Sequence, residues 1–298
     1  PSARAGGFSN LDAGGRRAGM FAVTARPDDA SAIFHNPAGL TLLEGTQFYH
    51  SQTWSFIDMG MRFYDSEGEL RPAHNVEPDW NIGLLPFFGA VTDLHTKRLR
   101  VGLGVYAPNA YGASLPADEP TRYHVTKALF VAARTTGSVA YQLTDRLSLG
   151  VGVSAIYVYL RGERIMNPLV MDDPDRRFDP QAETEPYDSL LKMEGYDLTW
   201  GANAGLLFEV LPGFRLGAAF TRGASVALEG DVTVKLPDES TQSTTHTTRM
   251  VIPFTLRGGF NWEIAPDVEL GADIYYWHYQ VYQEHRMTLD EPLLNIEE

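Results

Sequence analysis

Cysteine is absent from the sequence, and its absence excludes several kinds of site at once. None of the 298 residues is a cysteine, so disulfide scaffolds, thiolate zinc sites and cysteine nucleophiles are excluded. The absence also fits a compartment in which stray thiols would be oxidised, although many cytosolic proteins lack cysteine as well.

Positive charge is scarce too. The chain has 24 Lys and Arg residues against 38 Asp and Glu residues, which gives a net charge of -14. A surface that binds nucleic acid needs a cationic surplus to neutralise phosphates. We therefore expect no nucleic acid partner.

Long apolar runs are missing. The most apolar stretch, residues 82–91, is interrupted by Gly83, Pro86 and Gly89, whereas a membrane helix needs about 20 apolar residues. A helical membrane protein is excluded, but a membrane barrel is not, because its strands carry only about ten alternating residues each. Residues 1–7 are small and polar and do not resemble a signal peptide, so an exported protein would be present here in its mature form.

Motifs for metals, cofactors and catalysis are also lacking. The eight histidines are scattered, without a His-Glu-x-x-His spacing, so we expect no metal site. The Gly-x-Gly steps at 102–104 and 150–152 lie inside expected strands and not before helices, so they are not phosphate-binding loops. No two carboxylates are fixed by spacing into a catalytic pair. We expect neither a cofactor nor an enzymatic activity.

What the sequence does contain is period-two alternation, repeated many times. In residues 147–159 the odd positions are apolar or aromatic, and the even positions up to 154 are small: Ser148, Gly150, Gly152 and Ser154. Residues 198–210 and 268–276 repeat the pattern. Because side chains on a strand alternate between its faces, each segment is predicted to lie between an apolar and a polar medium.

Further strands are predicted near residues 46–64, 79–92, 97–109, 127–143, 213–235 and 246–263. This makes about nine strands, each longer than the five or six residues usual in soluble proteins. Tight polar junctions at 144–146, 211–213 and 265–267 contrast with long connections at 167–190 and 237–245. Short turns at one end and long loops at the other are typical of outer-membrane barrels. In the alternative, a soluble β-rich binding protein or enzyme, the apolar face would be a packed core.

The first fifty residues carry a family resemblance. They contain Gly-Gly-Arg at 14–16, Asp-Asp-Ala at 28–30 and Ile-Phe-His-Asn-Pro-Ala-Gly-Leu at 33–40. This segment resembles the N-terminal hatch of the FadL/TodX family. The sequence YAPNAYG at 106–112 resembles the end of that family's third strand, and residues 147–164 and 200–205 resemble its fifth and sixth strands.

The resemblance implies an all-β fold, an antiparallel transmembrane β-barrel of about 14 strands plugged by its hatch. Residues 1–45 are then the hatch, and residues 46–298 are the barrel, expected to be incomplete toward the C-terminus. An open sheet of about nine strands would leave unpaired edges in lipid. We therefore expect strands beyond this sequence or a different closure.

Hatch residues follow from the same resemblance. They are Asp28, Asp29, Asn36, Pro37 and Ala38. Proline fixes its own φ and biases the preceding residue to extended geometry, so Asn-Pro predicts a rigid turn. The alternative is an ordinary loop before a strand.

A lateral gap in the wall is predicted at Pro108, Asn109 and Gly112, just after a well-formed strand. Proline cannot donate to the strand ladder and glycine weakens it, so pairing is expected to break there. A normal strand end leading into a loop is the alternative.

The candidate ligand-binding residues are Ile156, Val158, Leu160, Arg164 and Arg134. The three apolar ones share the face that is small and polar earlier in the strand, which indicates either an apolar pocket or a register shift at a bulge. Arg164 has the same parity and matches a basic residue of the family's inner pocket, where a guanidinium can hold a carboxylate. A water-facing arginine at the base of a loop is the alternative. Arg134, on the polar face of its strand, is the second candidate.

The resemblance implies transport of hydrophobic molecules, such as long-chain fatty acids, through the bacterial outer membrane. Ligand would be captured among exterior loops, held in the lumen and released sideways. An aromatic or alkane hydrocarbon fits equally well, and outer-membrane lipid and lipopolysaccharide would surround the barrel. Alternatively, a barrel of this type is a structural or secretion-associated docking partner, with a protein partner at its open edge.

Overall fold

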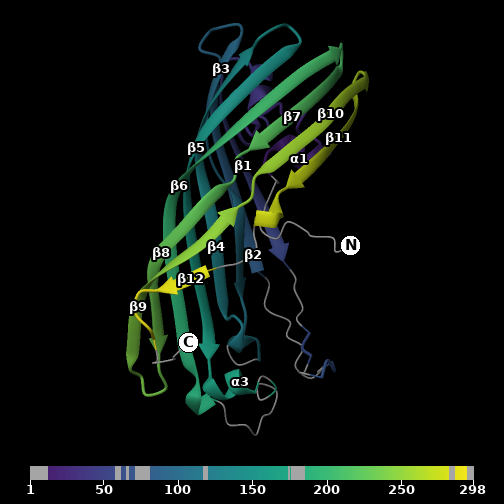
Figure 1. Cartoon of the computed structure of the whole chain (residues 1–298). Coiled ribbons are helices and arrows are strands. Elements are labelled where there is room, and N and C mark those ends of the chain that lie inside the picture. Colours follow the sequence, from purple (N-terminus) through teal and green to yellow (C-terminus); the bar gives the residue numbers. More distant parts are fainter. Residues whose placement is uncertain are drawn as a thin grey trace.

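A computed structural model describes residues 13–57, 62–64, 67–70, 81–116, 120–173, 175, 185–281 and 286–293. The described residues form one 12-stranded antiparallel sheet curled into a half-barrel (Figure 1). Its strands are β1 (Thr46–Ile57), β2 (Asn81–Thr92), β3 (Leu99–Ser114), β4 (Lys127–Gln142), β5 (Leu147–Met166), β6 (Ser189–Leu211), β7 (Phe214–Thr221), β8 (Ala224–Lys235), β9 (Thr241–Ile252), β10 (Thr255–Ala265), β11 (Val268–Trp277) and β12 (Arg286–Leu289).

The helical segments are short and are not part of the sheet, which we call the wall. The N-terminal segment contains α1 (Gly15–Met20), α2 (Ala32–His35) and η1 (Pro37–Leu42). The others are η3 (Pro120–Tyr123), α3 (Pro168–Asp172), η5 (Glu185–Tyr187) and η6 (Tyr279–Val281). No helix among the described residues combines the length and the apolarity needed to cross a membrane.

The sheet follows chain order along most of its path. Neighbours run β1-β2-β3-β4-β5-β6-β7-β10-β11, while β8 pairs with β6 and β9, and β12 pairs with β9. β6 is long enough to pair with β8 over residues 190–196 and with β7 over residues 203–211. β7 and β8 therefore follow one another along the same side of β6.

The predicted alternation is confirmed, and its apolar face points outward. On β5 the odd positions from Leu149 to Tyr157 are exposed and the even positions from Ser148 to Val158 are buried. Outward side chains on three strands are largely uncovered, with 64% of Val153, 71% of Leu198 and 75% of Ile274 exposed. A soluble β-sandwich would need a second layer packed against these residues, and the described residues provide none.

Two predicted strands are interrupted, and the prediction of single strands near 213–235 and 246–263 was wrong. Breaks at residues 222–223 and 253–254 divide them into β7 and β8, and into β9 and β10. Gly223 lies against Pro253 so closely that a Cβ atom on it would lie 2.5 Å from the Ile252 carbonyl oxygen. Proline lacks the N–H that the ladder needs. The long connection predicted at 237–245 was also wrong, since β9 already begins at Thr241.

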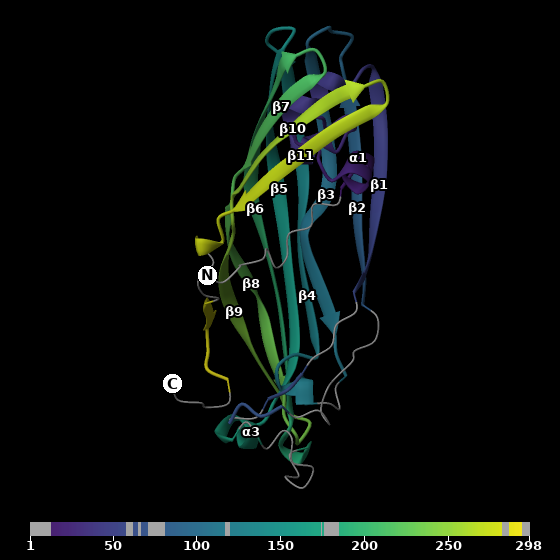
Figure 2. The ribbon, with the colours of Figure 1, turned by 90° about the vertical axis from the view of Figure 1, so that its right-hand side faces the viewer.

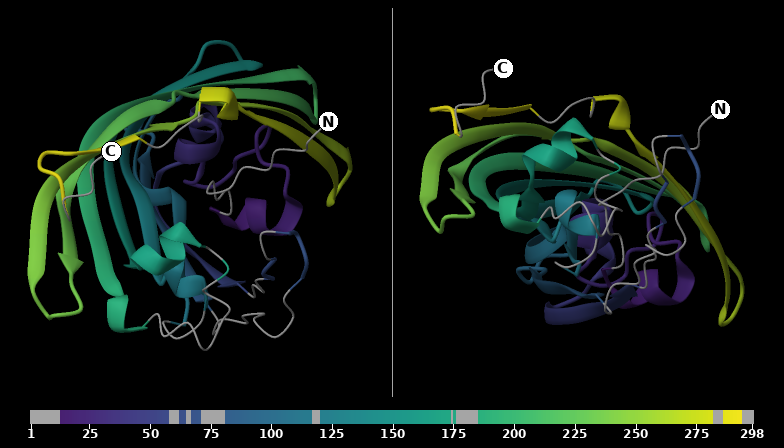
Figure 3. Two further views of the ribbon diagram at one scale, coloured as in Figure 1. Left: turned by 60° about the horizontal axis from the view of Figure 1, so that its bottom comes forward. Right: turned by 90° about the horizontal axis from the view of Figure 1, so that it is seen from below.

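Turns and long connections separate to opposite ends of the sheet (Figure 1). The turns at 93–98, 143–146, 212–213 and 266–267 lie at one end, which we call the turn end. The connections 115–126 and 167–188 lie at the other, which we call the loop end. The N-terminal helices lie inside the curve of the sheet near the turn end (Figures 2 and 3).

Candidate functional site: the hatch and the lumen

The N-terminal segment, residues 13–45, is bound to the inner face of the sheet, and we call it the hatch. Asn36 sits at its centre: the side-chain nitrogen donates to the carbonyl oxygens of Thr24 (2.8 Å) and Leu206 (3.1 Å). Its side-chain oxygen accepts from the Ala38 N–H at 3.1 Å, which caps η1 at Pro37. Asn36, Pro37 and Ala38 thus form the buried turn expected of Asn-Pro, tied to the wall.

Side chains of the wall hold the hatch mainly through its backbone. The Asn203 amide donates to the Ile33 carbonyl at 2.8 Å, and Arg100 Nε donates to the Leu43 carbonyl at 2.6 Å. Asp273 Oδ2 accepts from the backbone N–H groups of Val23 and Thr24 at 2.8 and 3.0 Å. Buried bonds of this kind are costly to leave unmade, so the hatch has one defined position on the wall.

Small residues on the inner face make room for the hatch. A Cβ atom on Gly150 would lie 2.3 Å from the Pro37 carbonyl carbon, one on Gly205 would lie 1.9 Å from Asn36 Oδ1, and one on Gly217 would lie 2.2 Å from the Thr24 oxygen. The small face that the sequence shows along β5 and β6 is therefore a docking surface for the hatch.

Asp28 and Asp29 organise the hatch itself. Asp29 accepts from the backbone N–H of Ser31 at 2.7 Å and of Gly15 at 3.1 Å. Asp28 pairs with Arg16 at 2.8 Å, and Arg16 also pairs with Glu269 of β11 at 2.9 Å. Burial alone would lower the pKa of Arg16, but the hydrogen bonds and charges of Asp28 and Glu269 raise it above its ordinary value.

His35 is buried in the hatch in its neutral form. Burial, together with the nearby Arg257 and Arg17, lowers the pKa of His35 to about 3, although a hydrogen bond to the Ala13 carbonyl opposes the shift. His35 Nε2 lies 2.6 Å from that oxygen and can only donate to it. No charge is therefore present on this ring at neutral pH.

The apolar residues predicted to line a pocket face inward. Ile156 and Val158 are fully buried, and Leu160 packs partly buried against the same cluster. Pairing of β5 with both neighbours keeps one register along the strand, so the alternative of a bulge is excluded. The cluster, which we call the lumen cluster, also contains Phe130, Ala132, Ala224, Val226, Leu228, Met250 and Ile252.

The two predicted arginines lie in different surroundings. Arg164 is exposed near the loop end of β5, whereas its neighbour Glu163 is buried and pairs with Arg161 at 2.6 Å. Arg134 is 5% exposed and faces inward beside Ile156, its partner across the β4–β5 ladder. The structure therefore separates Arg164 from the hatch and brings Arg134 close to it.

Arg134 shares a small cavity with a residue that the sequence interpretation missed. The cavity is lined by Phe34 of the hatch, Pro108, Asn109, Arg134, Thr221, Ile252, Pro253, Thr255, Arg257 and Trp277. Arg257 lies between Leu256 and Gly258 on the strand predicted near residues 246–263, and the sequence interpretation did not single it out. The cavity thus brings together Arg134, two predicted lateral-gap residues, the hatch and Arg257.

The wall ladder is interrupted at the predicted lateral gap. β2 pairs with β3 only over residues 87–92, and the β3–β4 register shifts between Tyr106 and Asn109. Pro108 and Asn109 border this shift, whereas Gly112 pairs regularly with Leu129. A lateral exit at this point stays a prediction.

A second interruption lies along β6 between its ladder with β8 and its ladder with β7, where residues 197–202 lie outside both. Side chains replace the missing pairing: Asp197 Oδ2 accepts from the Ala227 N–H at 2.8 Å, and Arg222 donates to the Trp200 carbonyl at 3.1 Å. Sequence reasoning did not find this interruption, although Gly223 and Pro253 are its local signals.

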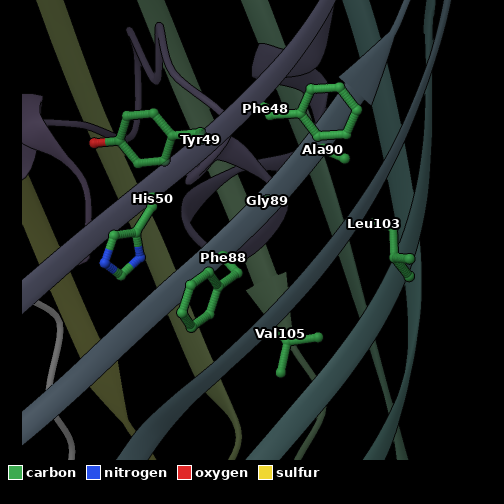
Figure 4. Close-up of a pocket in the computed structure, with 8 residues that line it drawn as sticks. All are labelled: Phe48, Tyr49, His50, Phe88, Gly89, Ala90, Leu103 and Val105. Carbon is green, nitrogen blue, oxygen red and sulfur yellow. The ribbon is translucent and has the colours of Figure 1, made fainter.

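A depression lies on the outer face of the sheet, away from the hatch (Figure 4). Phe48, Phe88, Leu103 and Val105 project around it, and the rings of His50 and Phe88 stack at 4.4 Å between their centroids. Because this face carries the exposed apolar residues, the depression belongs to the outer belt and not to the lumen. Among the described residues, no group of three or more metal-ligating side chains comes together.

Known proteins with the same organisation could be identified by comparison. A family model described as Outer membrane protein transport protein (OMPP1/FadL/TodX) matches residues 2–291. A long-chain fatty acid transport protein from Escherichia coli O6:H1 is 23% identical over 234 residues, which cover 75% of this chain and 50% of that protein. The chain therefore spans half the length of this curated relative.

Solved structures share the fold. A FadL homologue from Pseudomonas aeruginosa superimposes with a TM-score of 0.75 at 17% identity, covering 95% of this chain and 70% of that one. The toluene transporter TodX of P. putida gives 0.70 at 17% identity, covering 92% and 72%. Together with the sheet, its apolar outer belt and its docked hatch, the family match shows that the chain belongs to the OMPP1/FadL/TodX family of outer-membrane transport proteins.

Proposed function

We propose that the protein transports hydrophobic molecules across the outer membrane and catalyses no reaction. The observation that carries this proposal is the opposite character of the two faces of the sheet. The outer face exposes an apolar belt suited to lipid, while the inner face holds the hatch and a closed lumen cluster. The docking alternative requires a wide, polar and unplugged lumen, and the docked hatch favours transport instead.

The driving force for binding would be transfer of apolar surface into the lumen cluster. Burial of each CH2 group contributes about 0.8 kcal/mol, so a long chain binds without many polar contacts. Ile156, Val158 and Leu160 would provide this surface. Long-chain fatty acids and an aromatic hydrocarbon, toluene, are named for the relatives, and we propose these two classes of substrate for this chain.

The path would begin at the loop end and leave through the wall. Arg164, which is exposed near the loop end, would meet an anionic head group first. Exit would use the gap between β2 and β3 beside Pro108 and Asn109, with Gly112 at its border. Outer-membrane lipid would receive the ligand there.

β1 and β11 each pair with one neighbour among the described strands. We expect further strands to pair with their free edges, because lipid offers no hydrogen-bond partner to unpaired backbone groups.

An engineered disulfide can test whether the hatch must move. Thr41 Oγ1 in the hatch lies 2.9 Å from Ser148 Oγ on β5, and the chain has no cysteine of its own. We expect the double substitution Thr41→Cys and Ser148→Cys to form a bridge that stops uptake of radiolabelled oleate or toluene by cells whose own transporter of this family is deleted. Reduction should restore uptake.

The two single-cysteine variants are the matched controls, and both should transport at the wild-type rate with or without reductant. Continued uptake with the bridge fully formed, shown by mass spectrometry, would contradict gating by the hatch. Failure of the unmodified protein to restore uptake of either substrate would contradict the transport function itself.

A further inference from the structure

The interruption along β6 has the length and the shape of a bulge in the wall. Six residues of β6, 197–202, face seven residues of the neighbouring chain, 222–228, and the ladders of β6 with β7 and with β8 both stop short of them. An unequal number of facing residues disrupts pairing locally. At about 3.3 Å per residue, the interrupted part of β6 is about 20 Å long. Irregular backbone at membrane depth is tolerated where it borders a cavity, so this stretch is a candidate for a passage.

Gly223 and Pro253 are surplus to the alternation of their strands. The β7–β10 ladder and the β8–β9 ladder have the same register. However, the inward side chains occupy odd positions in β7 and β10 and even positions in β8 and β9. A reversal of this kind needs one extra residue in each strand, and proline also lacks the N–H that a ladder requires. The two residues therefore produce the interruption together.

The same level marks the edge of the apolar belt. Toward the turn end, Phe220 and Leu256 are exposed on the outer face. Toward the loop end, where β8 and β9 lie (Figure 1), the outer face is polar. Its exposed residues are Ser225, Glu229, Asp231, Lys235, Thr241, Ser243, Thr245 and Arg249. Aromatic rings gather at the edge of a bilayer, and the rings of Tyr157 and Tyr196 stack at this level. The interruption therefore lies at the exterior leaflet, the one at the loop end.

Apolar surface lies on both sides of the interruption. On the inner side, Ile156 of the lumen cluster is paired with Thr199, and Val226 of the same cluster belongs to the facing stretch. On the outer side, 71% of Leu198 and 56% of Trp200 are exposed. Only this interrupted stretch of backbone separates the lumen cluster from the outer belt here.

Two charged side chains hold the interruption closed. Asp197 Oδ2 accepts from the Ala227 N–H at 2.8 Å. Arg222 donates to the Trp200 carbonyl oxygen at 3.1 Å, and its guanidinium lies 4.0 Å from the centre of the Trp200 ring. Side chains of this kind are released by rotation, whereas a continuous ladder would first have to lose several backbone hydrogen bonds. The closure is therefore easier to undo than the rest of the wall.

We propose that the interruption is a second lateral opening, through which hydrophobic molecules pass between the lumen cluster and the exterior leaflet when Asp197 and Arg222 release it. The inference rests on the proposed transport function and adds a route separate from the gap between β2 and β3. Both interruptions border the same cavity, which is lined by Pro108 on one side and by Pro253 on the other. A molecule in the lumen therefore has lipid within reach through either one.

Deleting Gly223 and Pro253 together tests the route. Six residues would then face six, the register between the two strands would be kept, and every inward residue would stay inward. We expect the ladder to close. Uptake of radiolabelled oleate and toluene, by cells whose own transporter of this family is deleted, should then fall by about half because one of two lateral routes is lost. Heat-dependent gel mobility shows whether the variant is folded. Uptake at the wild-type rate in the folded variant would overturn the second route.

Spin labels measure the opening itself without altering strand length. Labels on Leu198→Cys and Ser225→Cys lie on opposite sides of the interruption, and labels on Tyr157→Cys and Leu198→Cys lie across the continuous β5–β6 ladder. The first pair should show two distances in lipid vesicles, and the control pair should show one. Arg222→Ala should raise the open fraction about 2- to 10-fold, the range for the loss of one hydrogen bond. Arg249→Ala, which removes an exposed arginine of β9, is the matched control and should leave the fraction unchanged.

A single distance across the interruption, in both the wild type and Arg222→Ala, would overturn the opening while leaving transport through the wall at β3 intact. An equal open fraction in Arg222→Ala and Arg249→Ala would overturn the role of Arg222 in the closure. Failure of the wild-type protein to take up either substrate would count against the proposed function instead.

Discussion

At the scale of single residues, the hatch depends on a few buried polar side chains that hydrogen-bond to its backbone. Asn36 uses its amide nitrogen for two carbonyls and its amide oxygen for the cap of η1. Burial, together with Arg257 and Arg17, lowers the pKa of His35 and keeps the ring neutral, although its hydrogen bond to the Ala13 carbonyl opposes the shift. Leaving a buried hydrogen-bonding group without its partner costs more free energy than the hydrogen bond contributes when it is formed. Single substitutions at these residues should therefore weaken docking of the hatch more than they destabilise the wall.

The neutral state of His35 predicts that the hatch docks less firmly in acid. The pKa of His35 is about 3 in the docked hatch and about 6.5 for a free imidazole. Undocking therefore takes up a proton between these values, and docking is favoured above pH 6.5 and weakened progressively as pH falls toward 3. At pH 5.5 the docking free energy should be smaller by about 1.4 kcal/mol.

The measurement is hydrogen exchange of the hatch amides in the wild type and in His35→Gln, which keeps a donor for Ala13 but does not titrate. Comparing the two proteins at each pH removes the intrinsic pH dependence of exchange. The ratio of their rates should change about five-fold between pH 6.5 and 5.5. A constant ratio across this range would show that His35 stays neutral when the hatch opens.

At the scale of elements, β5 and β6 each have two functions, one on each face of the strand. Their outward residues form the belt, and their glycines and serines receive the hatch. Added volume on the inner face should therefore displace the hatch without disturbing the wall. The outward face, which is open around Gly137, should accept the same change freely.

Gly150→Ala tests this division, with Gly137→Ala as its control. The new methyl group at residue 150 would meet the Pro37 carbonyl carbon at 2.3 Å, whereas nothing lies within 4 Å at residue 137. Overpacking of this kind costs about 1–3 kcal/mol, so exchange of residues 29–42 should rise about 5- to 100-fold in Gly150→Ala only. Similar exchange in both variants would mean that the hatch does not rest on this glycine.

Sequence patterns predicted the strands well where one face is apolar along its whole length and the other is small or polar. The alternation at 147–159 predicted both the strand and its outward face, because period two leaves no other arrangement. The breaks at Gly223 and Pro253 were missed because the apolar alternation continues past them. Arg257 and Asp273 were missed as hatch contacts because their partners are distant backbone groups, and backbone carries no signal in the sequence. Arg164 was predicted from strand parity to face the lumen, but it is exposed while Glu163 beside it is buried, because exposure at that end of β5 depends on the surrounding loops.

At the scale of the whole molecule, the outer belt determines where the sheet can exist. Exposed apolar residues cover the outer face on most strands of the path. In water such a surface would drive aggregation, and in lipid it costs nothing. The belt therefore predicts that charge is tolerated at the turns but not in mid-strand.

Val153→Arg, at the middle of the exposed face of β5, should destabilise the folded protein by about 2–4 kcal/mol, the cost of arginine near the centre of a bilayer. Asp145→Arg, in the β4–β5 turn, is the control and should cost under about 1 kcal/mol, since it loses only an exposed pair with Arg98. Urea unfolding in lipid vesicles measures both. Equal stability of the two variants would argue that Val153 does not face the bilayer.

The way the wall holds the hatch has a consequence for how such chains diverge. Asn203, Arg100 and Arg257 bind carbonyl oxygens of the hatch, and Asp273 binds its amide hydrogens. Every residue type supplies a carbonyl, and all but proline supply an amide hydrogen. Side chains at many hatch positions can therefore be substituted while the backbone stays attached to the wall. Hatch segments can keep one conformation after their sequences have diverged.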